Sequence, residues 1–299
     1  MGIPTSDQAA LKDQRIFLWG MMVSMFCWGL SWTSGKIISH YADGGTIALY
    51  RFCVTFISMI FVVWVLKINI AVARQGWLFL IISAVLISIY SYLFFQGLTL
   101  GKAGAAGVLV TILNPVISYA IMLMMQKRMP NKKESLGLAL GLLAGVVLLK
   151  LWANWDMVFD AGNSYFLLAS LTWAILSIFT SKSSKFGSPV AFSFWMYGIG
   201  SLLLFLLLDK GSALSLWGRT DFVFWGNMIF SATITTAFAT TFYFVATSKI
   251  GASKASSFIF LVPFSATLGS WIFLSEIPIW NTIIGGCLGV GAVYVLNKK

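Results

Sequence analysis

Residues Ala103–Met125 read AGAAGVLVTILNPVISYAIMLMM, and this stretch decides the fold. A helix rises about 1.5 Å per residue and the hydrocarbon core of a bilayer is about 30 Å thick, so about 20 apolar residues suffice to cross it. The stretch carries no charged residue, opens on small residues and has Asn114-Pro115 near its middle. It therefore predicts a membrane-spanning helix that is interrupted halfway by a proline.

The stretch has a second copy later in the chain, where Ala252–Leu274 also opens on small residues and has a proline at the matching place. A single shift of 148 positions relates the two copies, and 148 is about half of the 299 residues. The shift takes Leu113 to Leu261, Pro115 to Pro263, Gly137 to Gly285 and Gly141 to Gly289. The sequence therefore predicts two similar halves, residues 1–151 and residues 152–299.

The composition is that of an integral membrane protein. Hydrophobic residues make up 59% of the chain and charged residues 10%, whereas soluble domains have about 25% charged residues. A net charge of +11 would favour a nucleic-acid partner in a soluble protein, but here the basic residues lie near the ends of apolar segments. We therefore expect the lipid bilayer, and no nucleic acid, as a partner.

The sequence gives little support to metal, cofactor or enzyme chemistry. The one histidine, His40, lies in an expected loop, and the three cysteines fall inside apolar runs without metal-ligand spacing. No Asp or Glu lies at an expected midplane position, and no GxxxxGK[ST] nucleotide motif occurs. An intramembrane enzyme would need a nucleophile with a base, or clustered metal ligands. We therefore expect no metal, no cofactor and no catalytic residue.

Ten apolar segments are candidates for transmembrane helices, five in each half. The first five expected spans are residues 16–39, 46–66, 77–98, 103–125 and 135–151. The second five are residues 164–181, 189–208, 222–247, 253–274 and 280–296. Because each half has an odd number of spans, the second half must enter the membrane from the opposite side. The predicted fold is all-α, with ten transmembrane helices arranged as two inverted five-helix repeats.

The distribution of Lys and Arg predicts the orientation in the membrane. With the N-terminus in the cytoplasm, 14 of the 20 Lys and Arg residues lie on the cytoplasmic side, 4 on the outer side and 2, Lys36 and Arg51, within spans. Short cytoplasmic loops carry an excess of basic residues, so both termini are expected in the cytoplasm. Inverted repeats place a binding site near the midplane between the halves and permit alternating access.

Several expected spans carry polar and aromatic residues at helical spacing, which predicts an aromatic-walled, weakly polar central cavity. The residues expected to bind a substrate there are Trp28, Ser31, Trp32, Arg51, Tyr92, Gln96, Asn114, Ser118, Trp173, Ser177, Thr236, Thr240, Tyr243 and Phe260. In the alternative interpretation, Ser and Thr hydroxyls bond to their own helix backbone, while Trp and Tyr mark the membrane interfaces.

Two prolines and three charged residues complete the set of candidates. Pro115 and Pro263 each remove a backbone donor, so we expect hinges or gates there, the alternative being ordinary tolerated prolines. Arg51, early in the second span, is either a structural tether or a contact for a substrate carboxylate. Lys36 fits a snorkelling side chain, although it too could meet a carboxylate. Glu276 is most simply a helix-end residue.

These residues together resemble the EamA repeat. The resemblance rests on WGLSWTSGK from Trp28 to Lys36, Arg51, the small residues before Asn114-Pro115 and the Gly-rich fifth span, and in the second copy on Trp173, Pro263, Glu276 and Gly285-Gly286. The chain is thus similar to the drug/metabolite transporter superfamily and, within it, to ten-helix exporters of the YddG type from bacterial inner membranes. The resemblance implies a basket-shaped bundle in which the first four helices of each half line a cavity and the fifth and tenth pack outside. Family repeats commonly end the fourth helix with Glu, whereas Arg128 stands here at the place that matches Glu276.

Together, the cavity and the resemblance predict a secondary transporter that exports small metabolites, amino acids foremost, by alternating access. Because the chain already contains both halves, we expect a functional monomer in the bacterial inner (cytoplasmic) membrane. Two alternatives stay open, namely multidrug efflux of hydrophobic cations and a membrane receptor that does not transport.

Overall fold

The computed structural model describes residues 6–297 with gaps at 154, 209, 252–254 and 256, and this part of the chain consists of helices and connecting loops. The first half holds α1 (Ser6–Ile38), α2 (Gly44–Val65), α3 (Trp77–Leu100), α4 (Ala103–Met125) and α5 (Lys132–Leu148). The second half holds α6 (Ala161–Thr180), α7 (Pro189–Leu207), α8 (Lys210–Trp217), α9 (Phe222–Ile229), the π-helix η4 (Phe230–Thr240), α10 (Thr241–Ile250), α12 (Val262–Leu274) and α13 (Trp280–Asn297). The short 3-10 turns are η1 (Arg74–Gly76), η2 (Trp155–Val158), η3 (Ser183–Lys185) and η5 (Ser257–Leu261).

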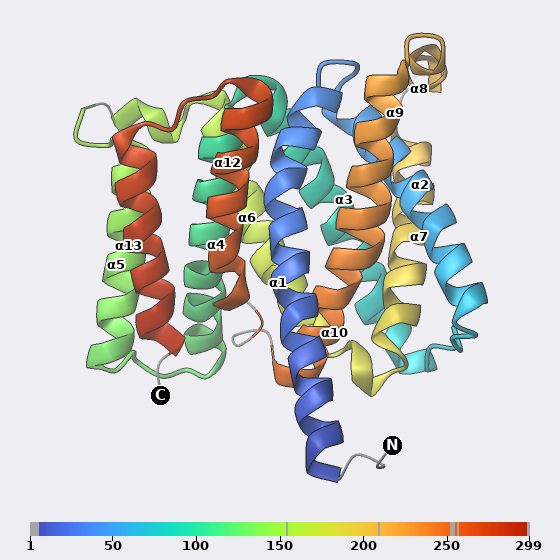
Figure 1. Cartoon of the computed structure of the whole chain (residues 1–299), viewed down its shortest axis with the longest axis horizontal. Coiled ribbons are helices and arrows are strands. Elements are labelled where there is room, and N and C mark those ends of the chain that lie inside the picture. Colours follow the sequence, from blue (N-terminus) through green and yellow to red (C-terminus); the bar gives the residue numbers. More distant parts are fainter. Residues whose placement is uncertain (1–5, 154, 209, 252–254, 256, 298–299) are drawn as a thin grey trace.

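Ten long helical rods stand in the described part of the chain where ten spans were predicted (Figure 1). The eighth rod consists of α9, η4 and α10, which follow one another without a break, and the ninth consists of η5 and α12. Two features were not predicted, the short helix α8 and the π-helical middle of the eighth rod. The fifth helix begins earlier than predicted because the side chain of Asn131 accepts a hydrogen bond from the backbone N–H of Glu134, at 2.9 Å, and so caps its start.

Length and composition mark most of these rods as membrane spans. Among the described residues, six segments are long and apolar enough to cross a membrane, namely Gly44–Val65, Arg74–Leu100, Ala103–Met125, Ala161–Lys185, Pro189–Leu207 and Phe222–Ile250. Val262–Leu274 and Trp280–Leu296 are shorter apolar helices. Large apolar side chains such as Trp64, Leu207 and Phe264 are exposed on the outside of the bundle, which suits contact with lipid. The predicted all-helical, multi-pass membrane fold is confirmed.

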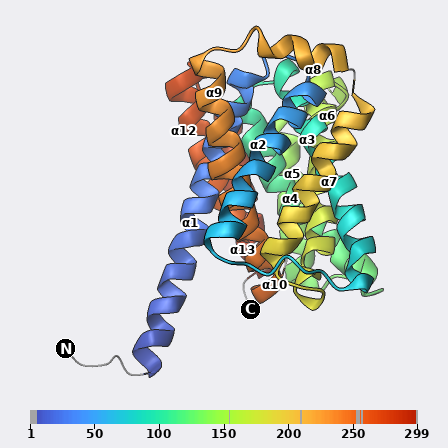
Figure 2. The ribbon, with the colours of Figure 1, turned by 90° about the vertical axis from the view of Figure 1, so that its right-hand side faces the viewer.

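The two halves run in opposite directions through the bundle. Helix α1 begins and helix α13 ends at the same end of the molecule, and α1 projects beyond the other helices there (Figures 1 and 2). At that end the α2–α3 and α6–α7 connections meet, where Val72 and Gly187 form an isolated antiparallel bridge. At the opposite end Asn281, at the start of α13, donates to the carbonyl of Val147 in the last turn of α5. The second half therefore enters from the end at which the first half finishes.

Helices α5 and α13 pack against each other at one side of the bundle (Figure 1). Their contact is reciprocal under the shift of 148 residues. A Cβ placed on Gly137 would lie 2.6 Å from Cγ of Leu296, and one placed on Gly285 would lie 2.6 Å from Cγ of Leu148. Only glycine allows this approach, so the repeated glycines of the sequence pair the last helices of the two halves.

Candidate functional site

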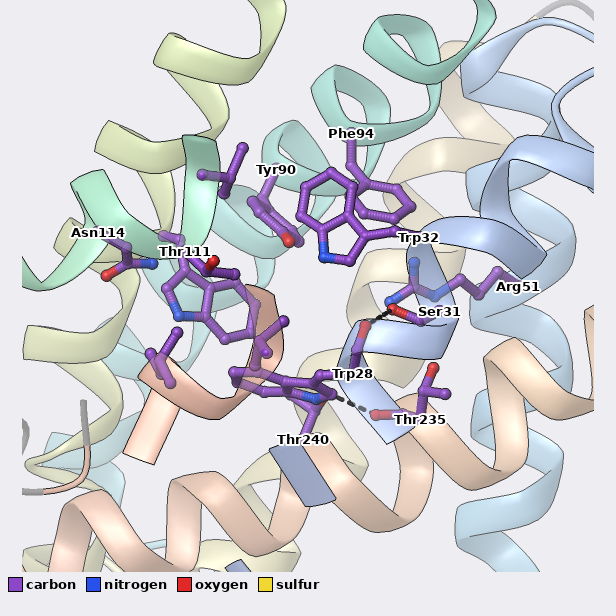
Figure 3. Close-up of a pocket in the computed structure, with 14 residues that line it drawn as sticks. Trp28, Ser31, Trp32, Arg51, Tyr90, Phe94, Thr111, Asn114, Thr235 and Thr240 are labelled. Carbon is purple, nitrogen blue, oxygen red and sulfur yellow. Dashed lines mark hydrogen bonds between the residues drawn. The ribbon is translucent and has the colours of Figure 1, made fainter. Parts of the chain in front are cut away.

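A buried cavity lies among helices of both halves (Figure 3). It encloses about 40 Å³, and a buried water needs about 10–15 Å³ of such space. The cavity in this conformation therefore has room for a few water molecules and not for an amino acid. Its lining comprises Trp28, Ser31 and Trp32 of α1, Arg51 of α2, Tyr90 and Phe94 of α3, Val110, Thr111 and Asn114 of α4, Trp173 of α6, Thr235 and Thr240 of η4, Ile259 of η5 and Val262 of α12.

Aromatic rings from both halves form much of the wall. The rings of Trp28 and Trp173, which belong to the first helix of each half, meet edge to face with centroids 5.2 Å apart. Tyr90 packs on Trp173 at 4.6 Å, and Trp32 packs on Phe94 at 4.7 Å. Trp28 Nε1 also donates to Thr240 Oγ1 at 3.1 Å. These contacts fix the ring orientations and present flat apolar faces to the space between them.

Arg51 is the charged residue of the lining, and its side chain points toward the cavity (Figure 3). It is only 8% exposed. Its Nε donates to Thr236 Oγ1 at 2.9 Å, and its Cζ lies 5.5 Å and 5.3 Å from the ring centroids of Phe94 and Phe95. Its Nη1 has no hydrogen-bond partner, and no described carboxylate forms an ion pair with it. A buried guanidinium with a free donor is a ready site for an anion.

The π-helix η4 explains how hydroxyl groups reach this cavity. Within it, Thr236 Oγ1 donates to the carbonyl of Ser231 at 2.7 Å, and Thr240 Oγ1 donates to the carbonyl of Thr235 at 2.9 Å, each five residues back. In a π-helix the backbone hydrogen bonds also span five residues instead of the four of an α-helix, and π-helical turns are frequent at functional sites. The wider turn brings Thr235 and Thr240 to the cavity and leaves Thr236 beside Arg51.

The other two charged candidates cap helix ends at the far end of the bundle from the termini. Lys36 Nζ donates to the carbonyl oxygens of Leu98 at 2.5 Å and Gly101 at 3.0 Å, at the C-terminus of α3. Glu276 accepts from the backbone N–H groups of Ala103 at 3.1 Å and Gly104 at 2.9 Å, at the N-terminus of α4. Each charge has the sign that complements the helix dipole. Lys36 and Glu276 therefore stabilise helix ends and do not line the cavity.

The structure brings half of the predicted binding residues to the cavity. Those in the lining are Trp28, Ser31, Trp32, Arg51, Asn114, Trp173 and Thr240. Four others do not line the cavity but contact a residue that does. Thr236 bonds to Arg51, Ser118 donates to Asn114 Oδ1 at 3.3 Å, Ser177 donates to the carbonyl of Trp173 at 2.9 Å, and Tyr243 packs on Trp28 with centroids 4.9 Å apart.

Three predicted residues are placed elsewhere or not at all. Tyr92 is 39% exposed on the outside of α3, where it meets Tyr165. Gln96 accepts from the backbone N–H of Gly44 at 3.2 Å, at the start of α2. The side chain of Phe260 lies outside the described part of the structure. Substrate binding by any of the predicted residues stays a prediction.

Sequence reasoning missed seven lining residues, which are Tyr90, Phe94, Val110, Thr111, Thr235, Ile259 and Val262. On α3 the prediction chose Tyr92 and Gln96 at i, i+4 spacing, whereas Tyr90 and Phe94 have the same spacing on nearly the opposite face. The shift of 148 residues could have found Val262, because it relates Val262 to the predicted Asn114, and it likewise relates Thr111 to Ile259. Both members of each pair line the cavity.

The two prolines occupy different local structures. Pro115 lies inside α4, where it cannot donate to the carbonyl of Thr111 four residues earlier. Pro263 lies in the first turn of α12, directly after η5. Proline is well tolerated in the first turn of a helix. The rod therefore changes from 3-10 helix to α-helix next to Pro263, whereas α4 continues as one α-helix past Pro115. Both positions neighbour the cavity, and their role as hinges stays a prediction.

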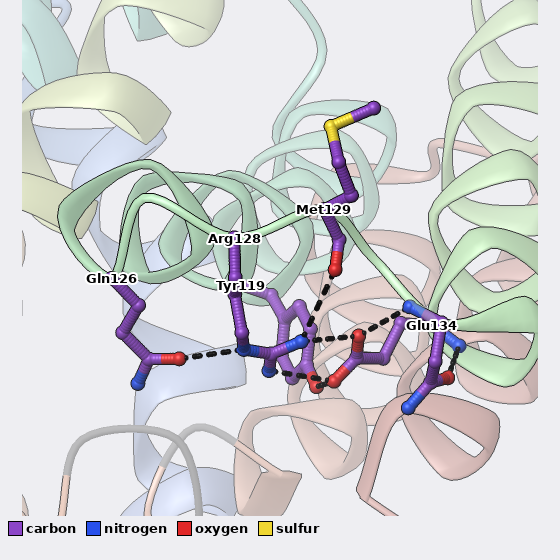
Figure 4. A network of polar contacts seen from close by, with 6 residues as sticks. Tyr119, Gln126, Arg128, Met129 and Glu134 are labelled. Atoms are coloured by element: carbon purple, nitrogen blue, oxygen red, sulfur yellow. Dashed lines mark hydrogen bonds and ion pairs between the residues drawn. The ribbon is translucent and has the colours of Figure 1, made fainter.

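Arg128, which stands where the matching position of the other half has Glu276, fastens the α4–α5 connection (Figure 4). Its Nη1 and Nη2 each lie 2.7 Å from an oxygen of Glu134, a bidentate pair. Glu134 also accepts from Tyr119 Oη at 2.6 Å and from the backbone N–H of Asn131 at 2.7 Å. Here the basic residue therefore organises a loop, and the acid that pairs with it lies on the next helix.

Two stretches of the chain, residues 15–150 and 160–298, match the EamA-like transporter family. The chain belongs to this family. One matched stretch falls in each predicted half. The EamA-like transporter described here is 23% identical over 273 residues to the uncharacterized transporter YoaV of Bacillus subtilis, with 90% of this chain and 92% of YoaV covered. It is also 23% identical over 297 residues to the uncharacterized transporter YyaM of the same organism, with 96% and 92% covered.

One solved crystal structure has the same fold as this EamA-like transporter. The two superpose with a TM-score of 0.61 over 93% of this chain and 96% of the other, at 15% sequence identity. Such low identity shows a shared fold and nothing about the substrate. Membership of the family makes this chain a multi-pass membrane transporter.

Proposed function

We propose that this EamA-like transporter is a secondary transporter that exports small metabolites bearing a carboxylate, amino acids foremost. The observation that carries the proposal is the cavity between the halves, with its aromatic walls and the free donor of Arg51. Aromatic faces suit apolar side chains, and a guanidinium suits a carboxylate. Two inverted halves around one cavity are the arrangement from which alternating access is built.

The size of the cavity supports a mechanism with a conformational change. A volume of about 40 Å³ excludes any amino acid, so the helices around the cavity must separate before a substrate enters. Pro115 and Pro263 lie on α4 and α12 beside the lining residues Asn114 and Val262. In this proposal they are the hinges, because a helix bends most easily where a backbone hydrogen bond is missing.

Orientation and assembly belong to the same proposal. The basic residues favour a bacterial inner membrane with both termini in the cytoplasm, and the termini lie at one end of the bundle (Figure 1). One chain supplies both halves of the cavity, which favours a functional monomer. Efflux of hydrophobic cations is the second candidate, and the buried charge of Arg51 disfavours it. No described residues group as a metal site, and no catalytic role is proposed.

Solute counterflow in proteoliposomes tests the proposal. Vesicles are loaded with unlabelled amino acids, drug cations or nucleosides, and entry of the labelled partner is followed without an ion gradient and then with a pH gradient. We expect saturable exchange of amino acids or related carboxylates. Exchange of drug cations alone would support the second candidate. Folded protein that exchanges no solute would contradict transport and favour the receptor alternative.

A further inference from the structure

We infer that the cavity selects small carboxylate anions with an aromatic-sized apolar body over zwitterions and cations. This selectivity rests on the proposed transport function. Among its carboxylate-bearing substrates it favours those without an ammonium group, and so it departs from the amino acids named foremost above. The observations behind it are the isolated charge of Arg51, the absence of an acid among the described lining residues, and the aromatic rings of the walls.

Arg51 brings a permanent positive charge into the cavity. A guanidinium does not lose its proton in proteins, and this one is 92% buried, since its exposed fraction is 8%. Around it the structure places the hydroxyl of Thr236 and the rings of Phe94 and Phe95, none of which carries a negative charge. A buried ion without a counter-ion is strongly unfavourable. An entering carboxylate supplies the missing charge and accepts from the free Nη1.

The rest of the lining has nothing equally suited to an ammonium group. Asn114, on the opposite wall from Arg51 in Figure 3, and Thr111 beside it offer neutral oxygens. None of the 14 lining residues is Asp or Glu. A monoanion therefore leaves the occupied cavity neutral, whereas a zwitterion leaves it with one net positive charge. In a low-dielectric interior that remaining charge is costly.

The walls indicate the shape of the anion's body. The rings of Trp28 and Trp173 pack against each other, as do those of Trp32 and Phe94, with centroid separations of 5.2 Å and 4.7 Å, and these contacts fix their orientations. Flat apolar groups stack well on such faces. A carboxylate attached to a ring or to a branched chain therefore fits this lining better than a small inorganic anion does.

Four compounds that share one body and differ in charge test the inference. They are 3-phenylpropanoate, phenylalanine, 3-phenylpropanamide and 3-phenylpropylamine, which are an anion, a zwitterion, a neutral amide and a cation. Binding to the purified full chain is followed at pH 7.5 by the ligand-dependent rise in thermal stability. We expect the anion to bind at least about tenfold tighter than the other three, the ratio that one hydrogen bond to a charged group carries. Phenylalanine or the amine binding as tightly as the anion would overturn the inference.

Chloride serves as the control for the body of the ligand. At equal concentration we expect sodium chloride to stabilise the protein far less than sodium 3-phenylpropanoate does. Chloride that stabilises equally would assign the site to small inorganic anions and overturn the inference of an aromatic-sized ligand.

A variant that adds the missing acid gives the sharpest test. Asn114→Asp has nearly the same shape and places a carboxylate on the wall opposite Arg51. We expect the ratio of phenylalanine affinity to 3-phenylpropanoate affinity to rise at least about tenfold, because the zwitterion now meets both charges. Ser118→Ala is the matched control, since it removes a hydrogen bond to Asn114 and adds no charge. An unchanged ratio in Asn114→Asp would overturn the inference. Arg51→Gln is a weaker test because it also breaks the bond to Thr236.

The same compounds separate this inference from the proposed transport function. Counterflow of each is measured beside its binding. Tight binding of the anion without counterflow would support the selectivity and contradict transport. Counterflow that favours phenylalanine over the anion would support transport and overturn the selectivity.

Discussion

At the scale of single residues, the functional candidates are the polar groups that their own helix does not satisfy. Many hydroxyls of the bundle bond to a carbonyl three to five residues back, as Ser177 and Thr235 do. These groups need no other partner. Arg51 differs, because its Nη1 is buried without a partner and faces a cavity. A hydrogen-bond donor in that situation is more informative about function than the number of polar residues around it.

Trp28 provides a prediction at this scale. Its Nε1 donates to Thr240 across the boundary between the halves. Trp28→Phe keeps an aromatic ring and loses this bond, so we expect a loss of about 1 kcal/mol in stability and a several-fold slower counterflow. Trp64→Phe is the control, since Trp64 is 74% exposed on the outside. Equal transport in both variants would remove the Trp28–Thr240 bond from the mechanism.

The cavity lining was only partly predictable from the sequence, for reasons visible in particular residues. The polar residues of α3 are spread around the helix, so they do not mark which face looks inward, and Tyr92 was chosen instead of Tyr90. Thr235 was missed because a 3.6-residue period does not hold in a π-helix. Trp28, Trp32 and Asn114 were found because polar or wide side chains in the middle of a span are hard to place against lipid.

At the scale of helices, the spans themselves followed from length, hydropathy and the repeat. All ten were predictable because each apolar run is bounded by polar or glycine-rich residues. Helix α8 was not, since its eight residues are too few for a period to show. The glycines at a spacing of 148 marked the repeat, and the structure shows that they also allow close packing.

The seam between α5 and α13 yields a prediction. A Cβ at Gly137 would approach Leu296 to 2.6 Å, so Gly137→Val should force the two helices apart. We expect a loss of about 1–3 kcal/mol in stability, typical of overpacking, measured as thermal unfolding in detergent. Gly285→Val should behave alike, because its contact with Leu148 is the repeat of the first. Gly291→Val is the control, as nothing lies within 4 Å of a Cβ there. A stable Gly137→Val protein would contradict the close seam.

Glu276 yields a second prediction for a helix. Its carboxylate accepts from the N–H groups of Ala103 and Gly104 and thereby caps α4 from the other half of the chain. We expect Glu276→Ala to cost about 0.5–2 kcal/mol in thermal unfolding, the usual effect of losing a cap. Lys102→Ala is the matched control, because Lys102 precedes α4 and makes no capping bond. Equal stability of the two variants would show that the cap contributes nothing.

At the scale of the whole molecule, the proposed alternating access requires that helices of the two halves separate. In this conformation α4 and α12 touch closely, since a Cβ at Gly104 would lie 3.3 Å from Cβ of Ser270. That approaches the Cβ–Cβ distance of about 3.5–4.5 Å in disulfides. The contact lies at the end of the bundle remote from the termini, next to the carboxylate of Glu276.

A cross-link between these helices tests whether they move. In a variant without Cys27, Cys53 and Cys287, the pair Gly104→Cys and Ser270→Cys should form a disulfide on oxidation and block counterflow. A reductant should restore it. Each single variant, oxidised in the same way, is the control. A fully cross-linked protein that transports at the normal rate would contradict a separation of α4 from α12.

The different contacts of Arg128 and Glu276 have a consequence for the proposed alternating-access cycle. Two identical inverted halves would give two end states of equal free energy, occupied equally in the absence of a gradient. Here the two matching residues differ. Glu276 caps the N-terminus of α4 with its carboxylate, whereas Arg128 forms a bidentate pair with Glu134. The end states of such a molecule differ in free energy, so one of them is the resting state. The gradient still sets the net direction of flow, but the half-saturating concentration of substrate will differ between the two sides of the membrane.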